Sequence, residues 1–402
     1  MQARVYLTEC DNVEGAHLGA QITGGPVSAM FPVPSPSTLP SNSVVGDAIP
    51  ESMKAVVHHE FGGPETLRIE ELPVPLPGPG EVLVQVRAVS VGRTLCIETR
   101  AGRLPFARSL SFPHVLGADH VGEVVAAAAD VDGALLGRRV AVFPVVHCAR
   151  CRACLAGRTE SCADLRLIGV HRQGAYARYC VVPARNVHPV PEDVSDLEVC
   201  ALALNGAVAR RQLDLAEVTA GSWVLVHGAS GGLGSTLVRL ALHRGARVAA
   251  CSRQGWKREL VAGLGADLVL DPDSPDFAET IREATEGAGV DAVVDNLVDP
   301  SLWARTAPLL AAGGTVVCSG AMAGGTAQLD LRQMYLRNQR VLGVRTARPA
   351  DVQALWRDVS EGLRAVVDPE SAFTLEQAAD AHRHLEEARN FGRVVLTVDA
   401  QG

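Results

Sequence analysis

The sequence has no long apolar run, no dense block of basic residues and no start that resembles a secretory signal. No run of apolar residues reaches the roughly 20 that a helix needs to cross a bilayer. The 45 acidic residues outnumber the 37 lysines and arginines, so the net charge is −8. This balance argues against nucleic acid or an anionic membrane surface as the partner. Because the chain does not begin with a basic segment followed by an apolar one, we expect a cytoplasmic protein without a cleaved signal.

The length and composition suit two folded domains preceded by an irregular segment. The 402 residues exceed one ordinary domain, and 47% apolar residues are ample for two cores. Residues 1–52 differ from the rest because they are rich in proline, serine and glycine and lack hydrophobic periodicity. Such a composition buries too little apolar surface to fold, so we expect 1–52 to be a disordered N-terminal extension.

A strand–turn–helix–strand pattern organises the second half of the chain. Residues 223–227 and 247–251 are apolar and strand-like, and the turn GASGGLG leads directly into an amphipathic segment. Glycines in such a turn let the backbone approach a pyrophosphate, and the helix start offers unpaired N–H groups. A glycine-rich window alone is also typical of a plain loop, but its place between two strands indicates a dinucleotide site. The predicted contacts are Gly228, Ala229, Ser230, Gly231, Gly232, Leu233 and Gly234, with Ala229 at the first glycine of the usual motif.

The residues after the second strand bear on the type of dinucleotide. An acidic residue there usually binds the ribose hydroxyls of NAD, whereas a 2′-phosphate favours hydroxyl and cationic partners. This chain has Ser252 and Arg253, with Lys257 one turn later and no acidic residue before Glu259. We therefore predict NADPH as the cofactor, bound in part by Ser252, Arg253 and Lys257. The alternative for these basic residues is a solvated start of the next helix.

Four cysteines within one short segment form the second motif. Residues 53–190 read as short strands separated by glycine and proline, which favours a compact barrel-like domain. Within it, Cys148, Cys151, Cys154 and Cys162 have the spacing C-x2-C-x2-C-x7-C. Four thiolates so close in sequence suit a closed tetrahedral Zn²⁺ site, whose role is structural because no ligand position stays open. Disulfides are the alternative, and they are disfavoured because nothing marks the chain as secreted.

The rest of the chain alternates between apolar strands and helical segments, which predicts a parallel sheet over 191–345. Helices are expected over 197–213 and 300–314, among others. The last segment, 346–402, reads as two helices and a closing strand, and we expect it to return to the first domain. Tyr176 and Tyr179 are expected to pack beside the cysteine lobe rather than to donate protons.

From Met53 to Val398 the chain resembles the medium-chain dehydrogenase/reductase superfamily. The matching segments are 53–86, GADHVGEV at 117–124, the cysteine lobe at 148–162, GASGGLG at 228–234 and GRVVLTV at 392–398. The lobe is similar to that of zinc alcohol dehydrogenases, whereas the opening and the glycine turn are similar to quinone oxidoreductases. The resemblance implies an α/β fold with a GroES-like β-barrel catalytic domain (53–190) and a Rossmann domain with a doubly wound parallel sheet (191–345). It also implies a cleft between the two domains and a homodimer paired through the edge of the Rossmann sheet.

The chain departs from the zinc alcohol dehydrogenase pattern at the catalytic metal ligands. The positions that match these ligands hold Gly92, Ala118 followed by Asp119, and Leu204. Glycine, alanine and leucine offer no ligand atom, and an open catalytic site needs about three protein ligands. The resemblance therefore implies that the catalytic zinc is missing. A shifted site built from Cys96 with Asp119 or His120 stays open as an alternative, because the segment after Gly92 is one residue longer than usual.

Without a catalytic metal, reduction of a conjugated C=C bond is favoured over oxidation of a simple alcohol. The alcohol reaction needs a Lewis acid or a base to carry the alkoxide, whereas an enolate needs only hydrogen-bond donors. We predict an NADPH-dependent reductase of α,β-unsaturated carbonyl compounds or quinones. The alternatives are an alcohol dehydrogenase or ketoreductase of the same family and a non-catalytic NADPH-binding protein. The predicted positioning groups are Thr94, Asp119, His120 and Asn205, of which Asp119 also suits a hydrogen-bond anchor inside the barrel.

Overall fold

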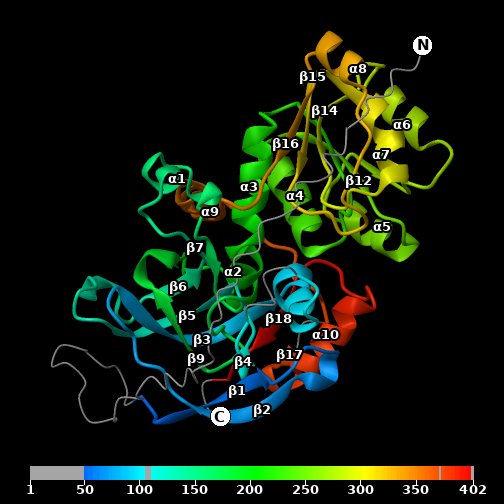
Figure 1. Cartoon of the computed structure of the whole chain (residues 1–402). Coiled ribbons are helices and arrows are strands. Elements are labelled where there is room, and N and C mark those ends of the chain that lie inside the picture. The colour runs from blue at the N-terminus through cyan, green and yellow to red at the C-terminus, as the bar shows by residue number, and fades with distance from the viewer. Residues whose placement is uncertain (1–48, 105–109, 371–372, 400–402) are drawn as a thin grey trace, which may run out of the picture. The chain divides into compact units, whose positions relative to one another are not determined.

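The computed structural model describes residues 49–104, 110–370 and 373–399 of the chain (Figure 1). The disorder expected for 1–52 therefore falls almost entirely outside the described residues, which begin at 49. None of the helices in the described ranges is both long and apolar enough to cross a bilayer. A mainly antiparallel sheet and a fully parallel sheet dominate the structure. The predicted α/β fold with a GroES-like barrel and a Rossmann domain is confirmed.

The first of these sheets is built around the long strand β3 (Glu81–Val91). The strand order is β10-β6-β5-β3-β18-β17, with β9 also paired to β3, and a smaller sheet has the order β2-β1-β4. The first two strands of the chain form an antiparallel pair, β1–β2. The other bounds are β1 Ser52–His58, β2 Arg68–Pro73, β4 His114–Val115, β5 His120–Ala127, β6 Arg139–Val142, β9 Tyr179–Pro183, β10 Val187–Pro189, β17 Phe373–Thr374 and β18 Val394–Thr397. Because β3 lies between β5, β9 and β18, most of its side chains are buried.

The end of the chain completes this sheet. Strand β18 pairs antiparallel with β3 from Val394 opposite Val91 to Thr397 opposite Ala88. It follows helices α9 (Pro349–Ser360) and α10 (Ala378–Glu386). The backbone just before β18 also reaches the glycine turn, because the N–H of Gly392 donates to the carbonyl of Ser230 at 2.9 Å. One short segment thus joins the two sheets.

The parallel sheet has the strand order β13-β12-β11-β14-β15-β16. In chain order this is 3-2-1-4-5-6, the arrangement of doubly wound dinucleotide-binding folds, whose ligands bind where the order reverses, between β11 and β14. The strands are β11 Trp223–Val226, β12 Arg247–Cys251, β13 Leu268–Leu270, β14 Val290–Val294, β15 Leu310–Cys318 and β16 Arg340–Gly343. The helices are α2 Asp196–Ala203, α3 Asn205–Leu215, α4 Gly232–His243, α5 Gly255–Ala262, α6 Phe277–Ala284, α7 Pro300–Thr306 and α8 Leu331–Leu336.

Alternating side chains of this sheet enter two separate cores. Val224 and Val226 of β11 pack with the residues of α3 and α4. Trp223 and Leu225 point the other way and pack with α6 and α7. Figure 1 shows these helix pairs on opposite sides of the strands. A parallel strand buried on both faces is apolar throughout, which is why its sequence shows no alternation with polar residues.

Two of the predicted helices end differently from the prediction. The helix expected over 197–213 is interrupted at Leu204, so that Asn205 begins a new helix. The helix expected over 300–314 ends at Thr306, and Leu310 already belongs to strand β15. Pro308 explains the second difference, because proline lacks the N–H that a helix interior requires.

Candidate functional site

The glycine turn between β11 and α4 is shaped for close backbone packing and for an anion. Gly228 has a φ of +64°, and a Cβ at Gly234 would lie 2.1 Å from the carbonyl oxygen of Gly228. Neither position therefore tolerates a side chain well. Helix α4 begins with no side-chain cap at its N-cap residue, Gly231. No side chain at the N-cap therefore competes with a phosphate for the first N–H groups of the helix, and the helix dipole also attracts an anion.

Asn205 and Arg393 lie directly beside this turn. A Cβ at Gly232 would be 3.0 Å from Cδ of Arg393 and 3.1 Å from Nδ2 of Asn205. Asn205 is only 6% exposed, and its Nδ2 has no hydrogen-bond partner within the described part of the chain. A buried amide donor without a partner costs free energy unless a ligand accepts its hydrogen bond. The glycine cradle and this donor together fit the phosphate and nicotinamide portions of a dinucleotide.

The end of β12 carries the groups predicted to bind a 2′-phosphate, and their present partners differ. Ser252 contacts Ser230 through their hydroxyls at 3.3 Å, which places it next to the glycine turn. Arg253 forms ion pairs with Asp273 and Asp299. Lys257, by contrast, is buried and donates to the carbonyl of Ala388 at 2.7 Å. Its ammonium group therefore already has a partner in the loop at Ala388.

Arg258 is a basic residue near the strand end that sequence reasoning missed. Its Nη1 donates to the carbonyls of Ser252 and Arg253 at 3.0 and 2.7 Å and to Asp271 at 2.9 Å. The guanidinium group thereby fixes the backbone on which Ser252 and Arg253 stand. Its position one residue after Lys257 was the available signal.

The carboxylate of Asp119 forms an ion pair with Arg393, an arginine near the C-terminus. Nη2 of Arg393 lies 3.0 and 2.9 Å from the two carboxylate oxygens of Asp119 and donates to the Ser90 hydroxyl at 2.7 Å. Asp119 is fully buried. A Cβ at Gly92 would lie 3.2 Å from the same Nη2, so the guanidinium fills the space beside Gly92. Of the two roles predicted for Asp119, this geometry favours the anchor.

His120 and Cys96 are buried and bound to backbone carbonyls. Nδ1 of His120 lies 3.0 Å from the carbonyl of Ala118, so this nitrogen carries the proton. Burial lowers the pKa of His120 to about 4, which keeps the ring neutral. The Cys96 thiol donates to the Ser90 carbonyl at 3.6 Å, and burial raises its pKa. Neither group is poised to exchange a proton near neutral pH.

The alternative of a shifted metal site is not supported by the arrangement of these side chains. Among the described residues, two groups of three or more metal-binding side chains bring their ligand atoms together, and neither contains Cys96, Asp119 or His120. One group is the cysteine lobe. The other is His243, Asp358 and Glu361 at exposed helix ends, where Asp358 already accepts a hydrogen bond from Arg210.

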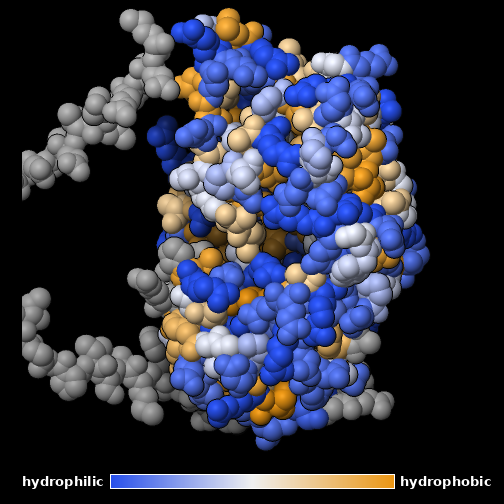
Figure 2. Space-filling model, turned by 90° about the vertical axis from the view of Figure 1, so that its right-hand side faces the viewer, coloured by the Kyte–Doolittle hydropathy of each residue, from blue (hydrophilic) through white to orange (hydrophobic). Residues whose placement is uncertain are grey.

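Thr94 lies on the exposed side of the turn of helix that follows β3. Its hydroxyl approaches the sulfur of Met322, in the loop after β15, at 3.9 Å. This contact joins the first domain to the parallel-sheet domain, as expected for a residue that borders the space between them. Figure 2 shows a hollow at mid-height of one face of the molecule, with apolar residues at its floor.

The predicted place of Tyr176 and Tyr179 beside the lobe is wrong. Both residues pack in the core of the first domain, and Tyr176 is fully buried. The Tyr176 hydroxyl lies 2.9 Å from Nε2 of His382, whose Nδ1 accepts a hydrogen bond from Arg100 at 2.9 Å. Because arginine only donates, Nε2 of His382 carries the proton and donates to the tyrosine oxygen. The helix that carries His382 lies more than 200 residues later, and no local pattern revealed this contact.

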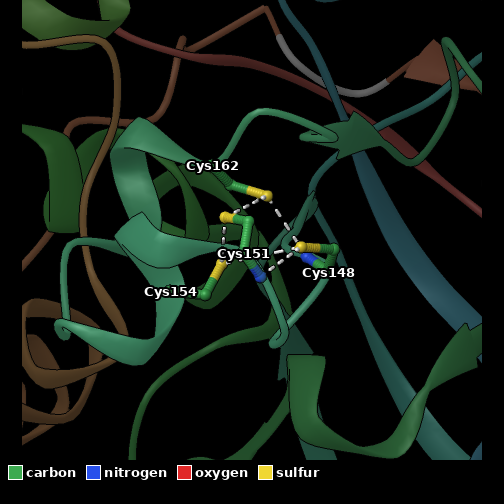
Figure 3. Close-up of side chains that lie close together, drawn as sticks. All are labelled: Cys148, Cys151, Cys154 and Cys162. Carbon is green, nitrogen blue, oxygen red and sulfur yellow. Dashed lines mark hydrogen bonds between the residues drawn. The ribbon is translucent and has the colours of Figure 1, made fainter.

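The four predicted metal ligands gather into one cluster (Figure 3). The sulfur atoms of Cys151 and Cys154 are 3.5 Å apart, those of Cys148 and Cys154 are 3.9 Å apart, and those of Cys151 and Cys162 are 4.0 Å apart. Tetrahedral Zn²⁺ with Zn–S bonds of about 2.3 Å requires sulfur separations of about 3.8 Å. The cluster therefore fits a closed zinc site. Cysteines at such distances without a disulfide also agree with this interpretation.

The surroundings of the cluster favour the thiolate form at some of its sulfurs. Hydrogen bonds from backbone N–H groups lower the pKa of Cys148, and they lower that of Cys151 to about 6. Desolvation and the neighbouring thiols raise the pKa of Cys154 to about 12. These thiols therefore differ in how readily they lose a proton. A bound divalent cation would remove this difference, because coordination deprotonates every thiol of the set.

Comparison with known proteins places these features in a family context. Residues 78–192 match the alcohol dehydrogenase GroES-like domain, and residues 232–361 match the zinc-binding dehydrogenase family. The L-galactonate-5-dehydrogenase of Escherichia coli is 31% identical over 299 residues, which are 74% of this chain and 86% of that protein. An alcohol dehydrogenase of Schizosaccharomyces pombe is 30% identical over 351 residues, 87% of this chain and 98% of that protein.

A solved structure agrees with these relatives. The crystal structure of an NAD-dependent alcohol dehydrogenase superposes with a TM-score of 0.79 at 36% identity. The match covers 86% of this chain and 100% of that chain. The arrangement of both domains is therefore shared with proteins of this kind.

Proposed function

The chain belongs to the zinc-binding dehydrogenases of the medium-chain dehydrogenase/reductase superfamily, and on this basis we propose that it is an NADPH-dependent reductase of α,β-unsaturated carbonyl compounds or quinones. The proposal rests on the residues that stand at the positions of the catalytic metal ligands. Gly92 and Leu204 offer no ligand atom, and Asp119 is bound by Arg393. The residues of the site therefore lack the groups that a simple alcohol requires.

The remaining side chains suit an acceptor that needs only orientation and hydrogen bonds. When bound, the cofactor supplies a hydride, which adds to the β-carbon of the acceptor while the electron pair of the C=C bond moves toward the carbonyl oxygen. Asn205 and Thr94 donate hydrogen bonds that stabilise this enolate oxygen. The α-carbon then takes a proton from solvent. We assign this proton to solvent rather than to His120, because the His120 ring is buried and bound to the carbonyl of Ala118.

NADPH is favoured over NADH by the end of strand β12. Ser252 and Arg253 follow this strand, and Arg258 holds their carbonyls in place. A 2′-phosphate would accept charge-assisted hydrogen bonds from Arg253 alongside its present carboxylate partners. Nucleotide titration tests this choice, with tighter binding of NADPH by about tenfold expected for the wild type and loss of the preference expected for Arg253→Ala. Equal affinities for NADPH and NADH in the wild type would contradict it.

An alcohol–ketone couple is the second candidate, and the names of the relatives favour it. The relatives described above are alcohol dehydrogenases and a sugar-acid dehydrogenase. Initial rates with NADPH and matched enones, quinones, ketones and aldehydes separate the two candidates. We expect kcat/KM for an enone or quinone to exceed that for the saturated ketone by at least about tenfold. The reverse ranking assigns the alcohol–ketone couple, and no oxidation of NADPH by any compound assigns a non-catalytic NADPH-binding protein.

We also propose a homodimer formed through the end strand β16. Large apolar residues are exposed along and beside this edge, namely Leu331 (69%), Tyr335 (68%), Leu336 (65%) and Val341 (38%). Of these residues, Val341 also lines a cavity of about 660 Å³, together with Trp303 and Leu329. Light scattering after size exclusion tests the proposal, with a dimer expected for the wild type and a monomer for Val341→Glu. A monomeric wild type would contradict it.

A cytoplasmic location is proposed on the chemistry of the lobe. Four cysteines that serve as thiolate ligands persist best where thiols stay reduced. Fractionation of the native host cells tests this assignment, and recovery of the protein outside the cytoplasm would contradict it.

A further inference from the structure

An ion pair ties the cysteine lobe to helix α9 of the C-terminal segment. Nε and Nη2 of Arg348 donate to the two carboxylate oxygens of Glu160 at 2.8 and 2.5 Å. Glu160 lies two residues before the ligand Cys162, and Arg348 is the N-cap residue of α9. The side chains are 15% and 29% exposed, so the pair is largely shielded from solvent. Two parallel hydrogen bonds between planar groups fix orientation as well as distance.

Helix α9 in turn packs against the start of α3. A Cβ at Gly206 would lie 2.6 Å from one methyl group of Leu355, which is fully buried on α9. The leucine therefore occupies the space above Gly206 that any larger residue would need. Gly206 directly follows Asn205, whose amide faces the glycine turn. A displacement of α9 would thus move the backbone on which Asn205 stands.

The lobe and α9 also share one core. Cys162 of the lobe and Leu165 just after it belong to the same extended buried cluster as Val352 and Leu355 of α9. Figure 1 shows helix α1 (Arg152–Leu155) of the lobe beside α9. The ion pair therefore joins two segments whose apolar residues belong to one extended core.

We infer that Glu160 and Arg348 are positioning residues for Asn205, through which the metal-bound lobe sets the geometry of the cofactor site. A zinc ion held by the four cysteines would fix the turn that carries Glu160, Glu160 holds the N-terminus of α9, and Leu355 packs on α3 at Gly206. The inference rests on the proposed function, in which the cofactor binds at the glycine turn beside Asn205. It gives the lobe a task beyond local stability.

A double-mutant cycle between Glu160→Gln and Asn205→Ala tests the inference in the full-length, zinc-loaded protein. The readout is the Kd for NADPH from fluorescence titration, with zinc content measured on the same samples. We expect Glu160→Gln to keep its zinc and to weaken binding by about fivefold, and we expect this effect to vanish in the Asn205→Ala background. Effects that multiply independently, or a Glu160→Gln protein that binds like the wild type, would overturn the inference.

Two further variants keep the test decisive. Glu81→Gln breaks a similarly shielded ion pair with Arg172 at the far end of β3, and it should leave the Kd unchanged. The reversed pair Glu160→Arg with Arg348→Glu should recover most of the affinity lost in Glu160→Gln, because the contact is rebuilt. If the reversed pair recovers no affinity, or if Glu81→Gln loses as much affinity as Glu160→Gln, the inferred coupling from Glu160 to Asn205 is contradicted.

The outcome is separable from that of the proposed function. Asn205→Ala alone reports whether the amide contributes to cofactor binding, and an unchanged Kd in that variant would remove the premise. A weakened Asn205→Ala variant combined with an independent Glu160→Gln effect would leave the contribution of Asn205 to cofactor binding intact and overturn only the inferred coupling from Glu160 to Asn205.

Discussion

At the scale of single residues, the buried pair of Arg393 and Asp119 distinguishes an anchor from a catalytic base. We expect Asp119→Asn to lower the free energy of unfolding by about 3 kcal/mol, because it leaves the buried Arg393 cation without its counter-charge. Urea unfolding measures this loss. Glu123→Gln, which breaks the exposed pair with Arg87, should cost less than about 1 kcal/mol. An unchanged stability of Asp119→Asn together with the loss of one limb of the pH–rate profile would instead identify a base.

The lowered pKa of buried His120 predicts how the free energy of unfolding changes in acid. Burial lowers the pKa of His120 to about 4 from the ordinary 6.5, so the unfolded chain binds this proton more readily than the folded chain. The stability that neutral His120 contributes is complete above pH 6.5 and is lost as the pH falls toward about 4. In this window we expect His120→Gln to reduce the slope of unfolding free energy against pH by up to about 1.4 kcal/mol per unit. Urea unfolding at about pH 7 and about pH 5 checks this, and an unchanged slope would contradict it.

Contacts between residues distant in sequence were the ones that sequence reasoning missed. Arg393 reaches Asp119 across 274 positions, and nothing local marked it beyond its place after a glycine in the closing strand. Lys257 was assigned to the cofactor because helix spacing put it near the strand end, yet the loop at Ala388 takes its ammonium group. The cysteine ligands and the glycine turn were predictable, because each set lies within one short segment whose spacing directly reflects its geometry.

At the scale of elements, the glycine turn requires glycine most strictly where α4 meets β11. A methyl group at Gly234 would lie 2.1 Å from the carbonyl oxygen of Gly228, whereas one at Gly231 would lie 3.6 Å from the same atom. We expect Gly234→Ala to lower the unfolding free energy of the cofactor-free protein by about 1–3 kcal/mol through overpacking. Gly231→Ala, the matched control, should stay within about 1 kcal/mol of the wild type. Equal stabilities of the two variants would contradict this account of the turn.

The cysteine lobe predicts a metal content that a single substitution removes. Four ligands of one closed site should hold about one zinc per chain, and Cys162→Ser should reduce this to a small fraction. Elemental analysis after dialysis measures both values. Retention of about one zinc per chain by Cys162→Ser would show that the ion binds elsewhere.

Some boundaries of helices and strands follow from the local sequence, whereas others depend on contacts with distant parts of the chain. The strands of the parallel sheet were predicted from their apolar runs, since a strand buried on both faces leaves that signature. The break at Leu204 was not predicted, because the sequence over 197–213 is helix-compatible throughout and Asn205 starts α3 only in the folded context. The break places Asn205 at the start of α3, where its amide lies beside Gly232 of the glycine turn.

At the scale of the whole molecule, the two sheets meet at the positions that the proposed chemistry uses. Gly392 binds the backbone of the glycine turn, Arg393 holds Asp119 in the first domain, and Thr94 contacts Met322 of the second. The fold was predictable from the order of its motifs. The reaction was less so, because the choice between a C=C and a C=O acceptor depends on side chains that four separate segments bring together.

The position of the transferred hydrogen in the product tests this account most directly. The protein is incubated with an enone and with NADPH that carries deuterium at the transferred position, and the product is examined by NMR. The account predicts deuterium on the carbon β to an intact carbonyl group. Deuterium on a carbinol carbon, with the C=C bond retained, would contradict it and assign the protein to the alcohol–ketone couple.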